Sequence, residues 1–543
     1  MSTALLLLAP LFPFVLALAG ILPAGRRAAP RLLWLAPLPG LLVALFVPLG
    51  TEAAGPAPMR LTLALDGPGA LLLGASSLLW MAAGAYAAAY LKDDPRRPAF
   101  SLWWLLTLAG SQGVFLVADF ASFYLAFSLL SLAAYGMTTH RDTAEARHAG
   151  AVYLTLTVVS EAFVLFALVA LAAGSADANP RLDEVASLLP ASPYAGAILV
   201  SIICGFGLKM GLVPLHVWMP LAHSAAPVPA ATLSSGILVK AGVIGLLRFL
   251  PLDMPTPGFG MALLAMGLLT AFYGVVVGLA QSRPKTILAY STVSQMGVIG
   301  AVAGAALAAG AAEAAAPIAF YGANHVLLKG GMFLAIGVMA LGGPSAGRVV
   351  PAVTALLCLS LAGLPFSGGA LAKYAVKDFV GGGWAGFLFT LSGAGTLLLT
   401  ARFVLVLSRT APVPGAAGRA AVIRVLAGAW GLVSLAGLVL PYLLYPGVTG
   451  SSLSAAFGWN ALADAAWPVA LGAIVAAGLY LRPLPVPEVP PGDILALVER
   501  GKPLLAPVMA AGLALDGQMR RWPVAGIALA LVALALVLAM RAA

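Results

Sequence analysis

Long apolar segments follow one another along almost the whole chain, and they limit what it can fold into. Because a helix needs about 20 apolar residues to cross a bilayer, we count about 16 candidate spans. They begin near Ala4, Leu32, Ala70, Ser101, Ala121, Ala149, Ala195, Pro229, Phe259, Thr286, Ala315, Val350, Ala385, Ala421, Trp467 and Val524. Charged residues make up 9% of the chain, against about 25% in a soluble domain. We therefore predict an all-α polytopic membrane protein with about 14–16 transmembrane helices.

The basic residues are spread unevenly over the loops between these spans. With the N-terminus placed outside, 19 of the 29 basic residues fall in loops on one side: Arg26, Arg27, Arg31, Lys92, Arg96, Arg97, Arg141, Arg147, Arg283, Lys285, Arg348, Arg409, Arg419, Arg424, Arg482, Arg500, Lys502, Arg520 and Arg521. Cytoplasmic loops are enriched in Lys and Arg. The bias predicts a multi-pass protein of the cytoplasmic (inner) membrane of a prokaryote with its N-terminus outside. The net charge of +10 therefore encodes topology and does not indicate nucleic-acid binding.

Five of the eight lysines lie inside or at the edge of predicted spans: Lys209, Lys240, Lys329, Lys373 and Lys377. A lysine in hydrocarbon costs a few kcal/mol or more unless it faces water or a polar partner. Unlike arginine, a lysine in such surroundings can release its proton. The intramembrane lysines therefore suggest a proton path.

Two of the predicted spans are interrupted by proline and glycine, one near 205–220 and the other near 360–377. The first contains GFGLKMGLVPLHVWMPLAH and the second LSLAGLPFSGGALAKYAVKD, with Lys209 and Lys373 beside the respective breaks. Five predicted helices separate the two breaks, and the broken helices cross in opposite directions. Paired broken helices are typical of inverted-repeat transporters with ion sites near mid-membrane. We predict two inverted five-helix repeats, at 100–250 and 258–409.

The two ends of the chain flank these repeats. Residues 1–99 are predicted to form helices 1–3 with an extracytoplasmic hairpin near 59–73, around the turn Asp66-Gly67-Pro68. Residues 410–543 are predicted to add C-terminal helices and a cytoplasmic amphipathic segment near 490–518, which suits either the membrane surface or a neighbouring subunit. No soluble insert is long enough for a redox domain, so electron chemistry must belong to other subunits.

Two further polar features occur within the apolar spans. Tyr321, His325 and Lys329 are spaced at i, i+4 and i+8, so they share one helix face. Because neutral imidazole can both accept and donate a proton, we interpret this face as a relay. Glu161 is the one acidic residue deep within a span, where it either neutralises a lysine of a neighbouring helix or modulates its protonation; both describe the same ion pair.

Motifs for other chemistries are missing from the sequence. Cys204 and Cys358 lie in apolar runs without metal-ligand spacing, so we interpret them as small buried hydrophobes. No ATP-binding loop, haem-attachment motif or nucleophile triad is visible. We therefore expect no catalytic residue, no bound cofactor and no metal.

Four motifs in this order resemble the antiporter-like subunits of respiratory complex I, of Mrp-type cation/proton antiporters and of membrane-bound hydrogenase and formate hydrogenlyase complexes. They are KMGLVPLHVWMPLAHSAAPVPAATLSSGILVKAG, RPKTILAYSTVSQMG, NHVLLKGGMF and LAGLPFSGGALAKY, and the likeness covers about Met59 to Arg409. The first motif is closer to the middle complex I subunit, the Mrp D-type and the hydrogenase-type subunits than to the distal complex I subunit. The resemblance implies a non-catalytic, proton-translocating subunit of a larger energy-converting complex, coupled to redox or ion gradients.

The resemblance also implies roles for individual residues. Lys209 matches the lysine of the first broken helix, on the proton-input side, and Lys240 matches the bridging lysine of the next helix. His325 and Lys329 match the central relay. Lys373 matches the residue of the second broken helix, on the exit side. The implied partners are other membrane subunits, membrane lipid and protons, with Na+ as a further possibility. Lys377 has no counterpart, and we place it at a helix end near Asp378.

One departure from the family pattern concerns the usual partner of the first lysine. Ser128 stands where family members usually carry a fifth-helix glutamate, and Glu161, one helix later, is a candidate replacement. Two alternatives therefore stay open beside proton translocation. One is a non-pumping scaffold or partner subunit, for example in inorganic-carbon uptake or assembly. The other is a Na+/H+ antiporter subunit, which a single deep carboxylate supports poorly.

Overall fold

The computed structural model describes residues 2–55, 62–177, 179–342, 346–410, 420–482, 489–490 and 492–495. Residues 1–491 form one compact unit, and residues 492–543 belong to a second. Most of the amphipathic segment predicted near 490–518 and the last span predicted near Val524 lie outside the described residues.

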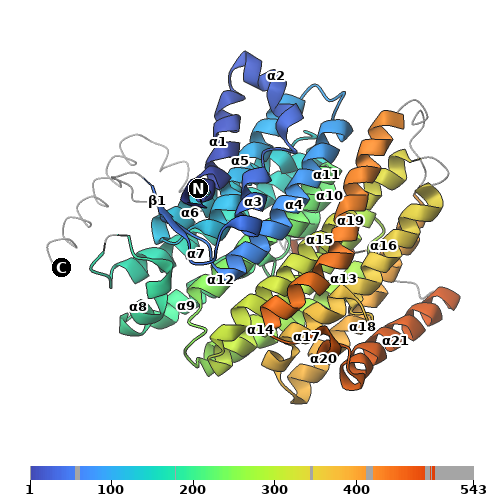
Figure 1. Ribbon diagram of the computed structural model, residues 1–543. Helices are drawn as coiled ribbons and strands as arrows, with labels where there is room; N and C mark the ends of the chain where they lie inside the picture. Colours follow the sequence, from blue (N-terminus) through green and yellow to red (C-terminus); the bar gives the residue numbers. More distant parts are fainter. Residues whose placement is uncertain are drawn as a thin grey trace, which may run out of the picture. The chain divides into compact units, whose positions relative to one another are not determined.

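The described chain is almost entirely helical, as predicted from its apolar pattern (Figure 1). The elements are α1 (Ser2–Ala19), α2 (Pro23–Leu32), α3 (Leu38–Phe46), β1 (Glu52–Ala54), β2 (Thr62–Ala64), α4 (Gly67–Tyr90), α5 (Arg97–Leu116), α6 (Phe120–Thr138), α7 (Ala144–Ala172), α8 (Val185–Ala191), α9 (Ala195–Met210), α10 (Trp218–Ala225), α11 (Val228–Leu233), α12 (Val239–Phe249), α13 (Pro257–Leu279), α14 (Pro284–Ala309), α15 (Ala315–Leu341), α16 (Ala346–Ala362), α17 (Gly368–Val380), α18 (Gly383–Ser408), α19 (Ala420–Thr449), α20 (Leu453–Ala456) and α21 (Trp459–Leu481). Short 3-10 turns at Leu182–Glu184 and Ala312–Ala314 precede α8 and α15.

Twelve helices among the described residues are long and apolar enough to cross a membrane. The shorter apolar helices α9 and α16 are the first halves of the two interrupted helices. These observations confirm a polytopic all-α membrane protein. The inverted relation of 100–250 to 258–409 stays a prediction.

Two predictions for the N-terminal region are wrong in detail. The span expected from Leu32 is not one continuous helix: α2, of ten residues, ends at Leu32, a turn follows at 33–37, and Pro37 and Pro39 begin α3, of nine residues. The hairpin consists of β1 paired antiparallel with β2, and it ends before the turn that we predicted at Asp66. Asp66 instead caps α4, since its Oδ1 accepts a hydrogen bond from Gly69 N at 2.6 Å.

The interruption near 205–220 lies between α9 and α10. α9 ends at Met210, Gly211 caps it with φ of +80°, and Pro214 follows in the connecting segment. The break leaves helix carbonyls without their usual donors, and Trp218 Nε1 satisfies the carbonyl of Leu208 at 2.9 Å. Val213 N donates to Thr270 Oγ1 on α13 at 3.0 Å. The break is therefore held by specific hydrogen bonds in the interior.

The interruption near 360–377 lies between α16 and α17. Gly363 has φ of +93°, and Phe366 has φ of +61°, a left-handed conformation that is strained for a residue with a side chain. Tyr442 Oη on α19 donates to the Phe366 carbonyl, and Ser367 caps α17 through Ala370 N at 3.2 Å. Contacts from a third helix thus keep this backbone in place.

A π-helical turn at Ser234–Leu238 joins α11 to α12, so that the two form one buried crossing segment. Such a turn holds one residue more than the α-helical turn that it replaces. It ends directly before Val239 and Lys240. The turn therefore sets the direction in which the Lys240 side chain leaves the helix.

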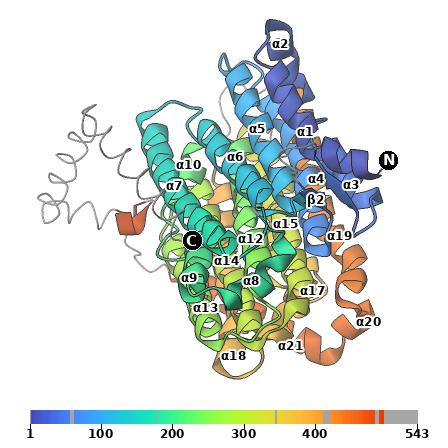
Figure 2. The same ribbon diagram turned by 90° about the vertical axis from the view of Figure 1, so that its left-hand side faces the viewer.

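Close backbone packing holds the second half of the unit together. Gly267 and Gly274 on α13 and Gly297 and Gly304 on α14 face the backbone of the opposite helix, and an added Cβ would lie 2.3–2.7 Å from a backbone atom. Small residues of this kind allow close helix packing in membranes. The almost fully buried α15 lies at the centre and packs against α4, α14, α16, α17 and α19 (Figures 1 and 2).

Arg248 joins three helix ends at one edge of this unit. From the last turn of α12 its guanidinium donates to the carbonyls of Val114, Phe115 and Val117, at 2.8–3.0 Å, where α5 ends. Nη2 also lies 3.1 Å from Asp66 Oδ2 at the start of α4. One buried side chain therefore satisfies several carbonyls that the end of α5 leaves without helix donors.

We expect Arg248→Gln to lower the free energy of unfolding by about 3 kcal/mol, because buried carbonyls lose their donors. The measurement is thermal unfolding in detergent. Arg147→Gln is the control, because Arg147 pairs with Asp142 at 3.0 Å with both side chains 62% exposed, and such a pair is worth less than about 1 kcal/mol. Equal unfolding midpoints for the two variants would contradict this role of Arg248.

Candidate functional site

Lys209 lies in the last turn of α9, directly before the first break, and is 2% exposed. Its Nζ donates to Ser131 Oγ on α6 at 2.7 Å. It also lies 5.5 Å from the ring centroid of Phe127 and 5.6 Å from that of Tyr153. A hydroxyl and two aromatic faces therefore surround the ammonium group. The sequence did not single out Ser131, which stands one turn after Ser128.

Glu161 lies on α7 and is 8% exposed. Its neighbour Ser160 donates to the Gly205 carbonyl at 2.8 Å, which ties α7 to α9. The charges of Glu161 and Lys209 interact across this interface. Among the described residues the hydrogen bond of Lys209 nevertheless goes to Ser131, and Oε1 of Glu161 has no hydrogen-bond partner. The carboxylate is thus near the lysine but not in direct contact with it.

Lys240 and His325 meet in the centre of the unit. Lys240 Nζ lies 3.0 Å from His325 Nδ1, and both residues are fully buried. Met296 Sδ on α14 is 3.8 Å from the same ammonium group, and the stem of Lys240 lies beside Gly322 of α15. His325 Nε2 has no hydrogen-bond partner among the described residues. One ring nitrogen is therefore engaged, and the other remains for water.

Lys329 lies one turn beyond His325 on the same face of α15 and is fully buried. Its Nζ donates to the Leu288 carbonyl of α14 at 3.1 Å. The charge of Lys329 interacts with both Lys240 and His325. The structure thus brings the three expected central residues together.

A chain of neutral hydrogen bonds runs beside this group. Tyr321 Oη donates to Gln295 Oε1 at 2.7 Å, and Gln295 Nε2 donates to Thr396 Oγ1 at 3.0 Å. The three side chains come from α15, α14 and α18. Gln295 and Thr396 were missed by the sequence analysis, because neutral residues in an apolar run give no signal of their own.

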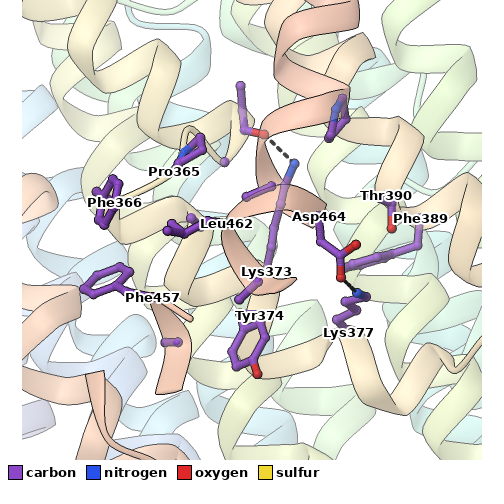
Figure 3. A pocket seen from close by; sticks show the side chains of 17 residues that line it. Pro365, Phe366, Lys373, Tyr374, Lys377, Phe389, Thr390, Phe457, Leu462 and Asp464 are labelled. Carbon is purple, nitrogen blue, oxygen red and sulfur yellow. Dashed lines mark hydrogen bonds and ion pairs between the residues drawn. The ribbon is translucent and has the colours of Figure 1, made fainter. Parts of the chain in front are cut away.

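Lys373 lies on α17 after the second break, at a hollow of about 50 Å³ (Figure 3). Its Nζ donates to the Ala362 carbonyl at the end of α16 at 2.6 Å. The stem of Lys373 passes Gly363, where an added Cβ would lie 2.9 Å from its Cδ. The break therefore supplies both the free carbonyl and the space for this side chain. Among the described residues no hydrogen bond links Lys373 to the central group.

Lys377 lies in the last turn of α17, next to Asp378, as expected, but its partner is a residue that the sequence did not indicate. It forms an ion pair with Asp464 of α21, at the edge of the same hollow (Figure 3). The side chains of Lys377 and Asp464 are 31% and 49% exposed. The pairing was not predictable because 86 residues and several helices separate the two positions along the chain.

His223 and Lys285 form a second polar group, which the sequence did not indicate. His223, in the last turn of α10, is fully buried, and its ring nitrogens have no hydrogen-bond partner among the described residues. Lys285, at the start of α14, donates to the carbonyls of Ser224 and Ala226, the latter at 2.8 Å. The charges of Lys285 and Lys329 both act on His223. The histidine of LAHSAAP was the available signal, but its spacing matched no constellation.

Comparison with known proteins assigns the chain to a family. Residues 117–400 match the model described as NADH:quinone oxidoreductase/Mrp antiporter, TM. Hydrogenase-4 component B of Escherichia coli is 28% identical over 292 residues, 51% of this chain and 43% of that protein. NADH-quinone oxidoreductase subunit N of Desulforudis audaxviator is 30% identical over 301 residues, 52% of this chain and 57% of that protein. The chain thus spans about half the length of these relatives.

Solved structures share the fold. A chain of the Mrp complex from a Dietzia species has a TM-score of 0.74 and 23% identity, covering 99% of this chain and 63% of that chain. A chain of the membrane-bound sulfane sulfur reductase, an archaeal respiratory membrane complex, has a TM-score of 0.65 and 20% identity, covering 88% and 98%. The family match includes Glu161, Lys209, the central group and Lys373, and it extends over more than half of the sequence. The chain therefore belongs to the NADH:quinone oxidoreductase/Mrp antiporter transmembrane family.

Proposed function

We propose that the chain is a proton-translocating, antiporter-like membrane subunit of a larger energy-converting complex. The observation that carries this proposal is the buried contact of 3.0 Å between Lys240 Nζ and His325 Nδ1, with Lys329 one turn away. Two ammonium groups beside one imidazole are costly as structural elements, because each needs a polar partner inside the membrane. They are suited to passing protons, because lysine and imidazole both exchange protons reversibly.

In this mechanism a proton from the cytoplasm reaches Lys209, beside the first break. Lys240 receives it through water, and His325 accepts it at one ring nitrogen and donates from the other. Lys329 passes it toward Lys373, and it leaves at the second break. The negative charge of Glu161 stabilises the positive charge of Lys209 across the interface between α7 and α9. A shift of one pKa unit corresponds to about 1.4 kcal/mol of interaction energy. Small changes of charge in adjacent subunits therefore suffice to protonate or deprotonate a lysine.

The proposed partners and location follow the same reasoning. The relatives are named as components of hydrogenase, quinone oxidoreductase and antiporter systems, and we assign this chain to a complex of that kind. Redox chemistry, where present, belongs to other subunits, so this chain itself is non-catalytic. We place it in the cytoplasmic membrane of a prokaryote, with its N-terminus outside and lipid around it, on the distribution of basic residues.

A scaffold subunit that does not pump is the second candidate. The replacement of the usual fifth-helix glutamate by Ser128 favours it, because Lys209 then lacks a carboxylate in direct contact. The retention of Lys209, Lys240, Lys329 and Lys373 together with His325 argues against it. A sodium site has less support, because Glu161 is the deep carboxylate of the described spans and Na+ prefers several oxygen ligands.

We expect Lys329→Ala to reduce proton movement per turnover of the assembled complex at least about tenfold, because the central group loses its exit-side member. Lys92→Ala is the matched control, since Lys92 is exposed and lies in a loop outside the spans. The measurement is proton uptake by inverted membrane vesicles, with and without Na+. Unchanged translocation in Lys329→Ala would favour the scaffold, and a strict Na+ requirement would favour the sodium antiporter.

We expect Glu161→Gln to reduce proton movement at least about tenfold as well, because Lys209 loses the negative charge of Glu161 that acts on it. Glu145→Gln on the same helix α7 is the control, since Glu145 pairs with Arg283 at 2.6 Å with both side chains more than half exposed. Equal pumping by parent and Glu161→Gln would show that Ser131 suffices as the partner of Lys209.

A further inference from the structure

The hollow beside Lys373 contains a second lysine and a carboxylate that the mechanism above does not use. Lys373 and Lys377 are four residues apart on α17 and therefore share one helix face. Both line the hollow, and Asp464 of α21 lies opposite them, paired with Lys377 (Figure 3). Of the residues that line it, Asp464 is the one carboxylate. Asp464 also lies beyond residues 117–400, which the family model covers.

Helix α21 forms a wall of the lysine site itself. An added Cβ at Gly393 of α18 would lie 2.9 Å from Lys373 Nζ, 3.1 Å from the Ala362 carbonyl oxygen and 3.6 Å from Pro468 Cβ. Pro468 follows Asp464 by four residues, so the two share one face of α21. Lys373 and Asp464 thus face the same small space from different helices.

The present partner of Lys373 cannot take its proton. The Ala362 carbonyl accepts a hydrogen bond but is not a base that can be protonated at ordinary pH. A carboxylate can be protonated, and that of Asp464 is 49% exposed, so that it also reaches solvent. The hollow is large enough to hold water between the two groups.

We propose that Asp464 accepts the proton that leaves Lys373 and delivers it to solvent; this inference rests on the proposed function. The proton moves from the Lys373 ammonium through water to the Asp464 carboxylate, which leaves a neutral amine and a carboxylic acid. Lys377 then has no counter-ion until Asp464 releases the proton. Release of the proton from Asp464 to solvent restores the ion pair.

The experiment measures proton movement per turnover in vesicles that contain the assembled complex, together with the amount of complex on native gels. We expect Asp464→Asn to reduce proton movement about tenfold or more, because an amide cannot accept the proton. Asp464→Glu should retain most of it. Lys377→Gln should also retain most of it, because the acceptor remains. Asp378→Asn is the matched control, since Asp378 is exposed on α17 and does not line the hollow.

A structural ion pair would give a different pattern. The double variant Lys377→Gln/Asp464→Asn leaves no unpaired charge, so it assembles even if Asp464→Asn does not, and we expect it to lose proton movement as well. Normal pumping by the double variant, or an equal loss in Lys377→Gln alone, would overturn the proposal. Loss in Lys329→Ala with normal pumping in Asp464→Asn would remove this inference alone. Normal pumping in both would remove the proposed function.

Discussion

The cost of holding an ammonium group inside a membrane shapes the interior of this protein. Each of the four lysines of the proposed path has a neutral partner: Lys209 the Ser131 hydroxyl, Lys240 the His325 ring, Lys329 the Leu288 carbonyl and Lys373 the Ala362 carbonyl. A carboxylate in direct contact would hold each lysine in its charged form, and removing that partner would be strongly destabilising. The neutral acceptors lower the free-energy cost of burying each lysine, but they leave the lysine able to gain or lose its proton. Among the lysines that the structure describes, Lys377 is the one with a carboxylate in direct contact, and its pair with Asp464 lies at the edge of the hollow.

The two helix breaks provide part of this polar lining. A continuous helix uses its own carbonyls, so an interruption in the membrane leaves acceptors that must be satisfied within the protein. At the second break Lys373 donates a hydrogen bond to the Ala362 carbonyl. At the first break Trp218 donates one to the carbonyl of Leu208, the residue before Lys209. The same irregularity that accommodates the lysine is thus stabilised by side chains of the site. Tyr442 adds a third helix to the second break.

The sequence predicted the class of fold and much of the central group, for physical reasons. Apolar length identifies spans, and the spacing of His325 and Lys329 on one helix fixes their common face. Two predictions were wrong where packing of the chain, and not the local sequence, determines the structure. The span expected from Leu32 is not one continuous helix, and the turn expected at Asp66 is a helix cap. Partners from distant helices, such as Ser131, Gln295 and Asp464, carry no local signal, because serine, glutamine and a single aspartate have many other uses in a membrane helix.

The π-helical turn at Ser234–Leu238 has a consequence for how Lys240 came to face His325. One residue more or less in a helix rotates everything beyond it by about 100°. Without the extra residue, the amine of Lys240 would point toward a different neighbour and away from α15. The π-helical turn therefore leaves α11 in its own packing and directs the side chain of Lys240 toward the His325 ring. Removing one residue from this turn would therefore separate Lys240 from His325 even with both side chains unchanged.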